Sequence, residues 1–195
     1  MIIFFDIETA SIYDKDNRDI EDLKDKYWDK LNFMPEFNKI ITICIWYKEN
    51  WNLIIKNLEW SEKEQITEFF KLAESNDLCW FNIKKFDLPF IIKRAIHLKK
   101  QIPYSLRVEW KKPREINNVI DLQEVYSYWV YWSIWNLDLI CNFLWIKSPK
   151  DEWIKWSDVQ EFYDNWKIED IIEYCKRDVK ATIEVYTNFK WFNLF

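Results

Sequence analysis

The chain has 195 residues, of which 49% are hydrophobic and 31% charged, and its formal net charge is −5. This composition excludes a disordered or fibrous protein, and we expect one globular domain over residues 1–195. The apolar runs are far shorter than the roughly 18 residues that span a bilayer, and no basic-then-apolar leader opens the chain. We therefore expect a cytoplasmic protein without a membrane partner.

The acidic balance excludes a protein that holds duplex nucleic acid by its overall charge alone. Nucleic acid stays open as a partner, because a divalent metal can neutralise an acidic cluster and then face a phosphate. The cysteines form no C-x-x-C pair and lie in apolar stretches, which indicates buried free thiols rather than a zinc site or a disulfide framework. They are Cys44, Cys79, Cys141 and Cys175.

The sequence contains no glycine and 14 tryptophans, although average usage predicts about 14 glycines in a chain of this length. Trp145 follows a helix-like stretch and Trp166 lies in a turn-like Asp-Asn-Trp-Lys segment, and glycine is typical of both places. We interpret the chain as a conceptual translation in which a stop codon that some bacterial lineages read as glycine was written as tryptophan. The alternative is a protein that is truly rich in tryptophan and free of glycine.

The first sixty residues indicate mostly strands. Residues 1–7 form an apolar run that predicts a buried strand, and residues 39–47 and 52–58 predict two more. We expect these three strands to be adjacent. The charged stretch 13–30 between them is typical of a loop.

Strands and helices alternate in the rest of the chain. Ser61 and Glu64 form an S-x-x-E capping box before apolar residues at helical spacing, which predicts a helix over residues 62–74. Further strands are predicted at residues 78–81 and 118–121, and further helices at residues 86–98, 137–144, 157–163 and 168–189. This order predicts an α/β fold in which helices flank a mixed sheet.

Three short segments carry acids that suggest chemistry. Asp6 and Glu8 are two residues apart at the end of the first strand, so their side chains share one face. Such acids repel and raise each other's pKa unless a cation lies between them. Asp87 begins a helix, and a role as a plain N-cap would explain it without any catalytic function. Tyr174 and Asp178 are four residues apart and therefore lie on one helix face. The alternative to a catalytic role is a tyrosine packed in the core beside an acid exposed to solvent.

Together these segments resemble the DEDD superfamily of 3′ to 5′ exonucleases, whose fold is ribonuclease H-like. The family motifs D-x-E, N-x(3)-F-D and Y-x(3)-D match, in order, Asp6 and Glu8, Asn82 with Phe86 and Asp87, and Tyr174 with Asp178. The likeness runs from residue 1 to about residue 186. Residues 144–159 look most like stand-alone exonucleases related to the proofreading domain of family B DNA polymerases.

The resemblance also places the chain in one branch of the superfamily. The other branch has a histidine five residues before the last aspartate, and Glu173 holds that position here, so the tyrosine branch is the one that matches. His97 is the only histidine of the chain. We interpret it as a solvated residue at the end of a helix.

The resemblance implies two divalent cations, Mg²⁺ or Mn²⁺, as cofactors. Asp6 would bridge the two ions, Glu8 and Asp178 would hold the ion that activates water, and Asp87 would support the other. Tyr174 would orient the attacking water or help to deprotonate it. This assignment agrees with general chemistry, because two ions can assist both the attacking and the leaving oxygen of a phosphodiester and carboxylates suit hard ions.

Contacts to nucleic acid are expected beside the acids. By resemblance, Thr9, Ala10 and Asn82 could meet the terminal nucleotide. Lys84 and Lys85 begin the most basic part of the chain, which could be a phosphate-tracking groove or a solvated face. That part continues through Lys93, Arg94, Lys99, Lys100, Lys111, Lys112 and Arg114.

We therefore expect a metal-dependent 3′ to 5′ exonuclease that acts on single-stranded or frayed DNA ends and releases nucleoside 5′-monophosphates. A 3′ exoribonuclease stays open as an alternative, because the tyrosine branch also contains RNA-trimming enzymes. A catalytically inactive nucleic-acid-binding domain is the alternative of another class, and the retained acids and tyrosine argue against it. Any proofreading or DNA repair would involve a polymerase or repair partner in trans, which the sequence does not identify.

Overall fold

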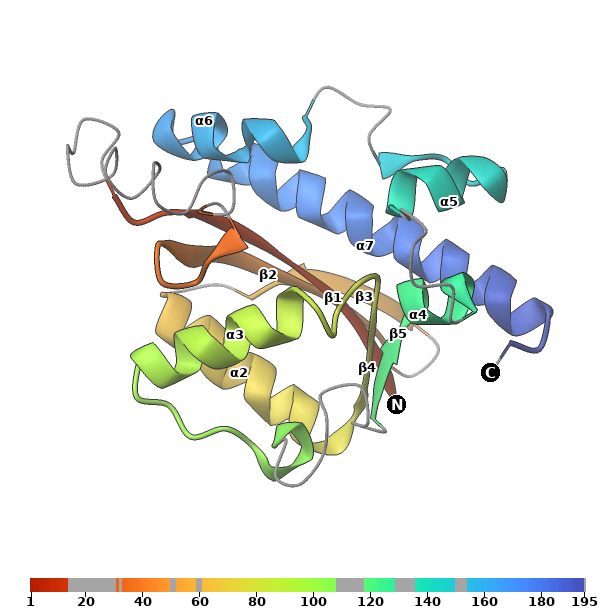
Figure 1. Cartoon of the computed structure of the whole chain (residues 1–195), viewed down its shortest axis with the longest axis horizontal. Coiled ribbons are helices and arrows are strands. Elements are labelled where there is room, and N and C mark those ends of the chain that lie inside the picture. The colour runs from red at the N-terminus through yellow and green to blue at the C-terminus, as the bar shows by residue number, and fades with distance from the viewer. Residues whose placement is uncertain are drawn as a thin grey trace.

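The structure is a computed structural model that describes residues 1–13, 31, 33–49, 52–58, 61–107, 118–128, 136–149 and 154–194. These residues form a five-stranded sheet with helices on both of its faces (Figure 1). The predicted α/β fold with a mixed sheet is confirmed. The predicted loop at residues 13–30 lies, apart from its first residue, outside the described residues.

The sheet has the strand order β3-β2-β1-β4-β5. Its strands are β1 (Ile2–Ser11), β2 (Asn38–Glu49), β3 (Asn52–Asn57), β4 (Asp77–Trp80) and β5 (Val119–Asp121). The first three pair antiparallel and are adjacent, as predicted, whereas β1 with β4 and β4 with β5 pair parallel. The parallel half brings the carboxyl ends of β4 and β5 to the same edge of the sheet.

Strand β1 is longer than the apolar run predicts. It continues to Ser11, so that Asp6 and Glu8 lie inside the strand rather than at its end. Asp6 is paired with Cys44 of β2, and the register shifts only after Glu8. The cause is the long antiparallel partner β2, whose backbone pairing sustains the strand past the last run of apolar side chains.

Alternation along β1 separates the two faces of the sheet. Phe5 packs on Phe69 of helix α2 (Glu62–Ser75), with ring centroids 4.6 Å apart. Phe4 packs on Tyr186 of helix α7 (Ile168–Trp191) at 5.1 Å on the other face. Because side chains alternate along a strand, Asp6 and Glu8 share the face that α7 covers.

The remaining helices differ from the prediction in detail. Helix α3 (Asp87–His97) has Phe86 at its N-cap, so Asp87 is its first helical residue and the predicted N-cap role is wrong. Helix α4 (Leu122–Ser127) was not predicted, because it is short and follows β5 without a loop. Helices α5 (Leu137–Phe143) and α6 (Val159–Asp164) lie on the α7 side (Figure 1), and a 3₁₀ turn at Trp156–Asp158 precedes α6.

Two helices end on tryptophans in the left-handed conformation. Trp145 follows α5 with φ 60°, and Trp166 follows α6 with φ 59°. In both places the next residue donates its backbone N–H to the helix, from Ile146 to Cys141 (2.8 Å) and from Lys167 to Phe162 (2.9 Å). This is the Schellman motif, whose left-handed residue is usually glycine. The tryptophan side chains are 96% and 87% exposed, so packing does not compensate for the strained backbone.

The core between the sheet and its helices is apolar, and the four cysteines are buried in it as free thiols, as predicted. Among the helices that the structure describes, none is both long and apolar enough to cross a membrane.

Candidate active site

The three sequence segments meet at one place in the fold. Asp6 and Glu8 project from β1 toward α7, and their side chains are only 6% and 3% exposed. Helix α7 contributes Tyr174, which is buried, and Asp178, which is half-buried. The negative charge of Asp178 raises the pKa of both β1 acids, so the carboxyl groups from the two elements lie close enough to interact.

Asp87 joins this cluster from the first turn of α3. Its side chain is 2% exposed. Its carboxylate accepts hydrogen bonds from its own backbone N–H and from that of Ile7, the residue between Asp6 and Glu8. The start of α3 therefore lies beside the middle of β1.

The electrostatics of the cluster are unfavourable without a cation. Burial is the largest cause that raises the pKa of Asp6, Glu8 and Asp87 well above their ordinary values, and the neighbouring carboxylates raise the pKa of each further. At Asp87 the backbone hydrogen bonds partly offset this effect. Buried charges need a partner, and a divalent cation would relieve both the burial penalty and the repulsion.

Tyr174 is fixed beside the acids by packing and by hydrogen bonding. Its ring lies in a small apolar cluster with Ile154, Val159 and Ile171, which joins α6 to α7. Its hydroxyl is hydrogen-bonded to Asp178, and burial together with the nearby acids raises the pKa of the phenol. The group at this position is therefore a neutral hydroxyl held by a carboxylate.

The sequence predicted Cys175 only as a buried thiol, but its sulfur lies among the acids. The ligand atoms of Asp6, Glu8 and Cys175 are all within 4.8 Å of one another. The Sγ atom donates a hydrogen bond to the backbone oxygen of Asp6 (3.5 Å), and burial raises the pKa of the thiol. The protonated thiol thus lies among the carboxylates. The carboxyl oxygens remain the donors that suit Mg²⁺ or Mn²⁺, so the residues present fit such ions.

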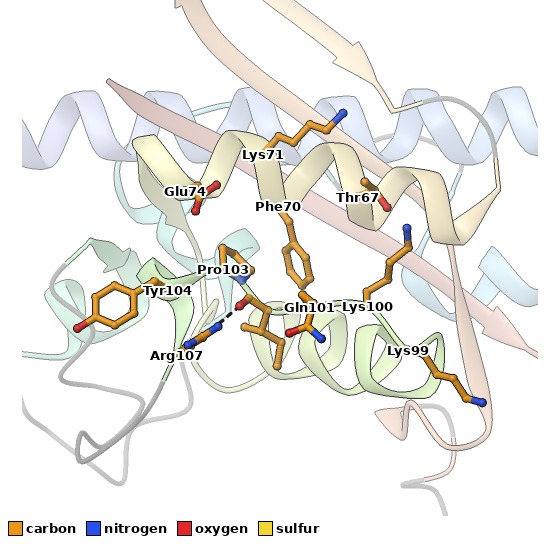
Figure 2. A pocket seen from close by; sticks show the side chains of 11 residues that line it. Thr67, Phe70, Lys71, Glu74, Lys99, Lys100, Gln101, Pro103, Tyr104 and Arg107 are labelled. Atoms are coloured by element: carbon orange, nitrogen blue, oxygen red, sulfur yellow. Dashed lines mark hydrogen bonds between the residues drawn. The ribbon is translucent and has the colours of Figure 1, made fainter.

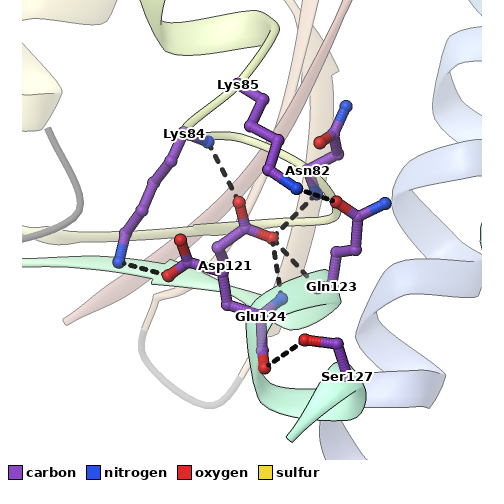
Figure 3. Close-up of polar contacts among 7 residues, drawn as sticks. All are labelled: Asn82, Lys84, Lys85, Asp121, Gln123, Glu124 and Ser127. Carbon is purple, nitrogen blue, oxygen red and sulfur yellow. Dashed lines mark hydrogen bonds and ion pairs between the residues drawn. The ribbon is translucent and has the colours of Figure 1, made fainter. Parts of the chain in front are cut away.

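Asp121 is a polar residue near the site that the sequence analysis did not single out. It ends β5, is 2% exposed and caps α4. Its carboxylate accepts hydrogen bonds from the backbone N–H groups of Asn82 (2.9 Å), Lys84 (3.1 Å) and Gln123 (2.9 Å) (Figure 3). Asn82 has φ 62°, so this carboxylate holds a left-handed turn in the segment that leads into Asp87.

The side chains of the same segment strengthen this attachment. Lys84 forms an ion pair with Glu124 of α4 (2.8 Å), and Lys85 donates a hydrogen bond to Gln123 (3.1 Å) (Figure 3). The turn is therefore joined to α4 through backbone and side-chain contacts. Its connection to the acids is also electrostatic, because the charge of Asp121 raises the pKa of Asp87.

The residues predicted to contact nucleic acid lie next to the acids along the chain. Thr9 and Ala10 continue β1 beyond Glu8, with Thr9 half-buried and Ala10 buried. Asn82 is half-buried, and Lys85 is the exposed residue of the turn before α3. Their contact to a nucleotide stays a prediction, as do the catalytic and metal-binding roles.

The basic stretch does not form one uniform surface. Arg94 is buried and makes two hydrogen bonds to Glu62 of α2, both 2.7 Å long. Lys93 forms an exposed ion pair with Glu36 (3.5 Å). His97 is exposed at the end of α3, as expected. Residues 111, 112 and 114 lie outside the described residues.

Comparison with known proteins decides the family. The model of a family described as predicted 3′-5′ exonucleases related to the exonuclease domain of PolB matches residues 31–193. The chain belongs to this family. The matched range contains Asp87, Tyr174 and Asp178, and Asp6 and Glu8 precede it. A search of curated proteins found no match to the chain.

A solved structure shows the same fold. The family B DNA polymerase from the hyperthermophilic archaeon Pyrobaculum calidifontis is similar with a TM-score of 0.64 and 14% sequence identity. The match covers 99% of this chain and 25% of that polymerase, so this exonuclease-family chain spans about a quarter of its length. At such low identity the likeness shows the fold alone, and it confirms the expected ribonuclease H-like fold.

Proposed function

We propose that the chain is a metal-dependent 3′ to 5′ exonuclease that releases nucleoside 5′-monophosphates from single-stranded DNA. The observation that carries this proposal is the convergence of four carboxyl groups from β1, α3 and α7 beside Tyr174. Burying acids together destabilises a fold, so a cluster of this kind favours a catalytic role. The family assignment supports the same class of reaction.

Asp6, Glu8, Asp87 and Asp178 would hold two ions, Mg²⁺ or Mn²⁺. When bound, such ions supply an activated water and neutralise charge on the phosphate. The fold of the chain determines where the carboxylates that would hold these ions lie. The carboxylate of Asp87 lies beside the backbone N–H of Ile7, so the carboxylates of α3 and β1 are close together.

Tyr174 would orient the attacking water. Its hydroxyl is held by Asp178, and its ring is packed between α6 and α7, so its oxygen has a defined place beside the carboxylates. Thr9, Ala10 and Asn82 would border the terminal nucleotide. Lys85 is exposed on the turn before α3, where it would approach the phosphate of a bound strand.

A digestion assay tests this function. The chain is incubated with 5′-labelled DNA and RNA strands of the same sequence, with Mg²⁺, with Mn²⁺ or with a chelator. We expect the DNA to shorten stepwise from its 3′ end, only with metal. If the RNA shortens faster than the DNA, the substrate is RNA and the chain is a 3′ exoribonuclease. A folded protein that leaves both strands intact with either metal would contradict the proposal.

A further inference from the structure

A depression lies at the end of α3 that is opposite Asp87. It has a volume of about 600 Å³ and is formed by one side of α2 and by the segment that follows α3 (Figure 2). Phe70 points from α2 toward this segment, between Pro103 and Lys100 (Figure 2). The volume is typical of sites that bind small ligands or parts of larger ones.

The lining of the depression is cationic, although the chain as a whole is acidic. Lys71, Lys99, Lys100 and Arg107 contribute positive charge, and Glu74 is the acidic residue among the lining residues. The formal charge of the whole chain is −5. Such a local excess of positive charge attracts anions to this part of the surface.

The end of α3 places two of these lysines. Lys99 has φ 55°, and Lys100 donates its backbone N–H to Ala95 (2.8 Å). This turn ends the helix and carries both lysines to the rim of the depression. Neither forms an ion pair with another described residue, although Lys100 lowers the pKa of Glu64 through its charge. By contrast, Lys84, Lys93 and Arg94, which lie nearer to Asp87, are paired with acids, and Lys85 donates a hydrogen bond to Gln123.

An aromatic ring completes the rim. Tyr104 is 78% exposed and lies beside Arg107 (Figure 2). The Arg107 side chain donates a hydrogen bond to the carbonyl of Ile102 (3.3 Å), which holds the guanidinium at the edge of the depression. Exposed aromatic rings among cations are the common means of binding single strands, because bases stack on the ring while cations contact the phosphates.

We propose that this depression binds the single strand several nucleotides before its 3′ end. This inference rests on the proposed exonuclease function. Helix α3 has 11 residues and is therefore about 16 Å long. The acids face α7 and the depression lies on the α2 side of the sheet, so the strand would pass the start of α3 and then follow the helix. Because stacked nucleotides advance by about 3.4 Å each, a strand with its 3′ end at Asp87 would need at least about five nucleotides to reach the depression.

Strand length gives the test. Binding of a 12-nucleotide and a 3-nucleotide DNA strand is measured in chelator, over a range of salt concentrations, for the wild type and for Lys99→Ala/Lys100→Ala. For the longer strand we expect the slope of log K against log salt to fall by about 1.4, because each single-strand phosphate contact contributes about 0.7. Tyr104→Ala should weaken its binding on the order of tenfold. The shorter strand should bind equally to all variants.

The control pair is Lys180→Ala/Lys190→Ala. These lysines are exposed on α7, and their replacement changes the net charge by the same amount. Equal weakening by the control pair, an unchanged slope for Lys99→Ala/Lys100→Ala, or equal loss for the 3-nucleotide strand would overturn the inference. A polyglutamate peptide that competes fully with the 12-nucleotide strand would assign the depression to an acidic protein instead. If the wild-type chain does not hydrolyse DNA, only the proposed function is contradicted, because the binding assay is carried out in chelator and needs no hydrolysis.

Discussion

The carboxylate of Asp87 accepts a hydrogen bond from the backbone N–H of Ile7. Ile7 lies between the two acids of β1, so the first turn of α3 is attached to the strand at the point where the acids project. The attachment does not depend on the side chain of residue 7. It places one carboxylate beside two others at the central strand of the sheet.

Removing one carboxylate should abolish hydrolysis without unfolding the protein. We expect Asp6→Ala and Asp178→Ala to lose metal-dependent activity, because each acid is a proposed ligand. Loss of an acid also relieves repulsion within the cluster, so the melting temperature in chelator should not fall. Activity assays and thermal melts measure both effects. Full activity of either purified variant would contradict the assignment of the metal site.

Removing only the hydroxyl of Tyr174 should slow the reaction while leaving the site assembled. We expect Tyr174→Phe to lower turnover on the order of 10²-fold, the scale of a group that orients or moves a proton. The phenyl ring still fills the cluster between α6 and α7, and the four carboxylates stay in place. The Mn²⁺ concentration for half-maximal activity should therefore change little. An unchanged turnover number would make Tyr174 a packing residue.

Asp121 should act on the metal site through the segment that leads into Asp87. Asp121→Asn replaces one acceptor oxygen by an amide NH₂ that faces backbone N–H donors. We expect the turn at Asn82 to move and the Mn²⁺ concentration for half-maximal activity to rise about tenfold or more, the scale of residues behind metal ligands. Saturating Mn²⁺ should restore much of the turnover. Asn136→Ala removes an N-cap bond of α5 (2.7 Å) and should leave the Mn²⁺ dependence unchanged.

The raised pKa values of the acids predict how stability depends on pH without metal. Asp6 and Glu8 have a higher pKa in the folded than in the unfolded protein. Their protonated forms therefore favour the folded state at low pH, and this contribution is lost as pH rises from about 4 through the folded-state pKa values. In chelator we expect melting temperature to fall between pH 5 and pH 8, and Mg²⁺ to restore it at pH 8. Asp6→Asn should flatten this dependence, and a wild-type profile identical to that of Asp6→Asn would refute the explanation.

The sequence predicted the features that short-range signals determine, such as a helix that begins at a capping box. The helix after Ser61 was expected from its capping box, and Glu64 does accept a hydrogen bond from the Ser61 N–H (3.0 Å). The acids were found because three short segments resemble the motifs of the exonuclease superfamily, and strand and helix periods put Asp6 with Glu8, and Tyr174 with Asp178, on one face of their elements. These features need no knowledge of distant contacts.

The features that the sequence did not predict depend on long-range pairing. Strand β1 extends to Ser11 because β2 continues beside it, and no local run of residues indicates this. Asp121 looked like the end of a strand, and its role appears only when β4 and β5 pair and bring it beside Asn82. Cys175 lies among the acids because α7 crosses β1 there, which helical periodicity alone does not specify.

The two left-handed tryptophans allow a direct test of the recoding interpretation. We expect Trp145→Gly and Trp166→Gly each to stabilise the chain by about 1 kcal/mol, because glycine adopts positive φ without steric cost. Both side chains are exposed and end their helices in the same Schellman geometry. Chemical denaturation of the purified variants measures the free energy of unfolding.

Trp191 is the matched control, because it is 83% exposed but is the last helical residue of α7 and does not have positive φ. Trp191→Gly should destabilise the chain or leave it unchanged, since the substitution relieves no left-handed backbone there and glycine has a lower helix propensity, by up to about 1 kcal/mol in a helix interior. Stabilisation by glycine at 145 and 166 but not at 191 would show that the left-handed backbone is the cause.

Intact-mass spectrometry of the native protein tests the recoding interpretation itself. Replacement of 14 tryptophans by glycine gives a mass well below the 24.4 kDa of the written sequence, and a mass of 24.4 kDa would exclude recoding.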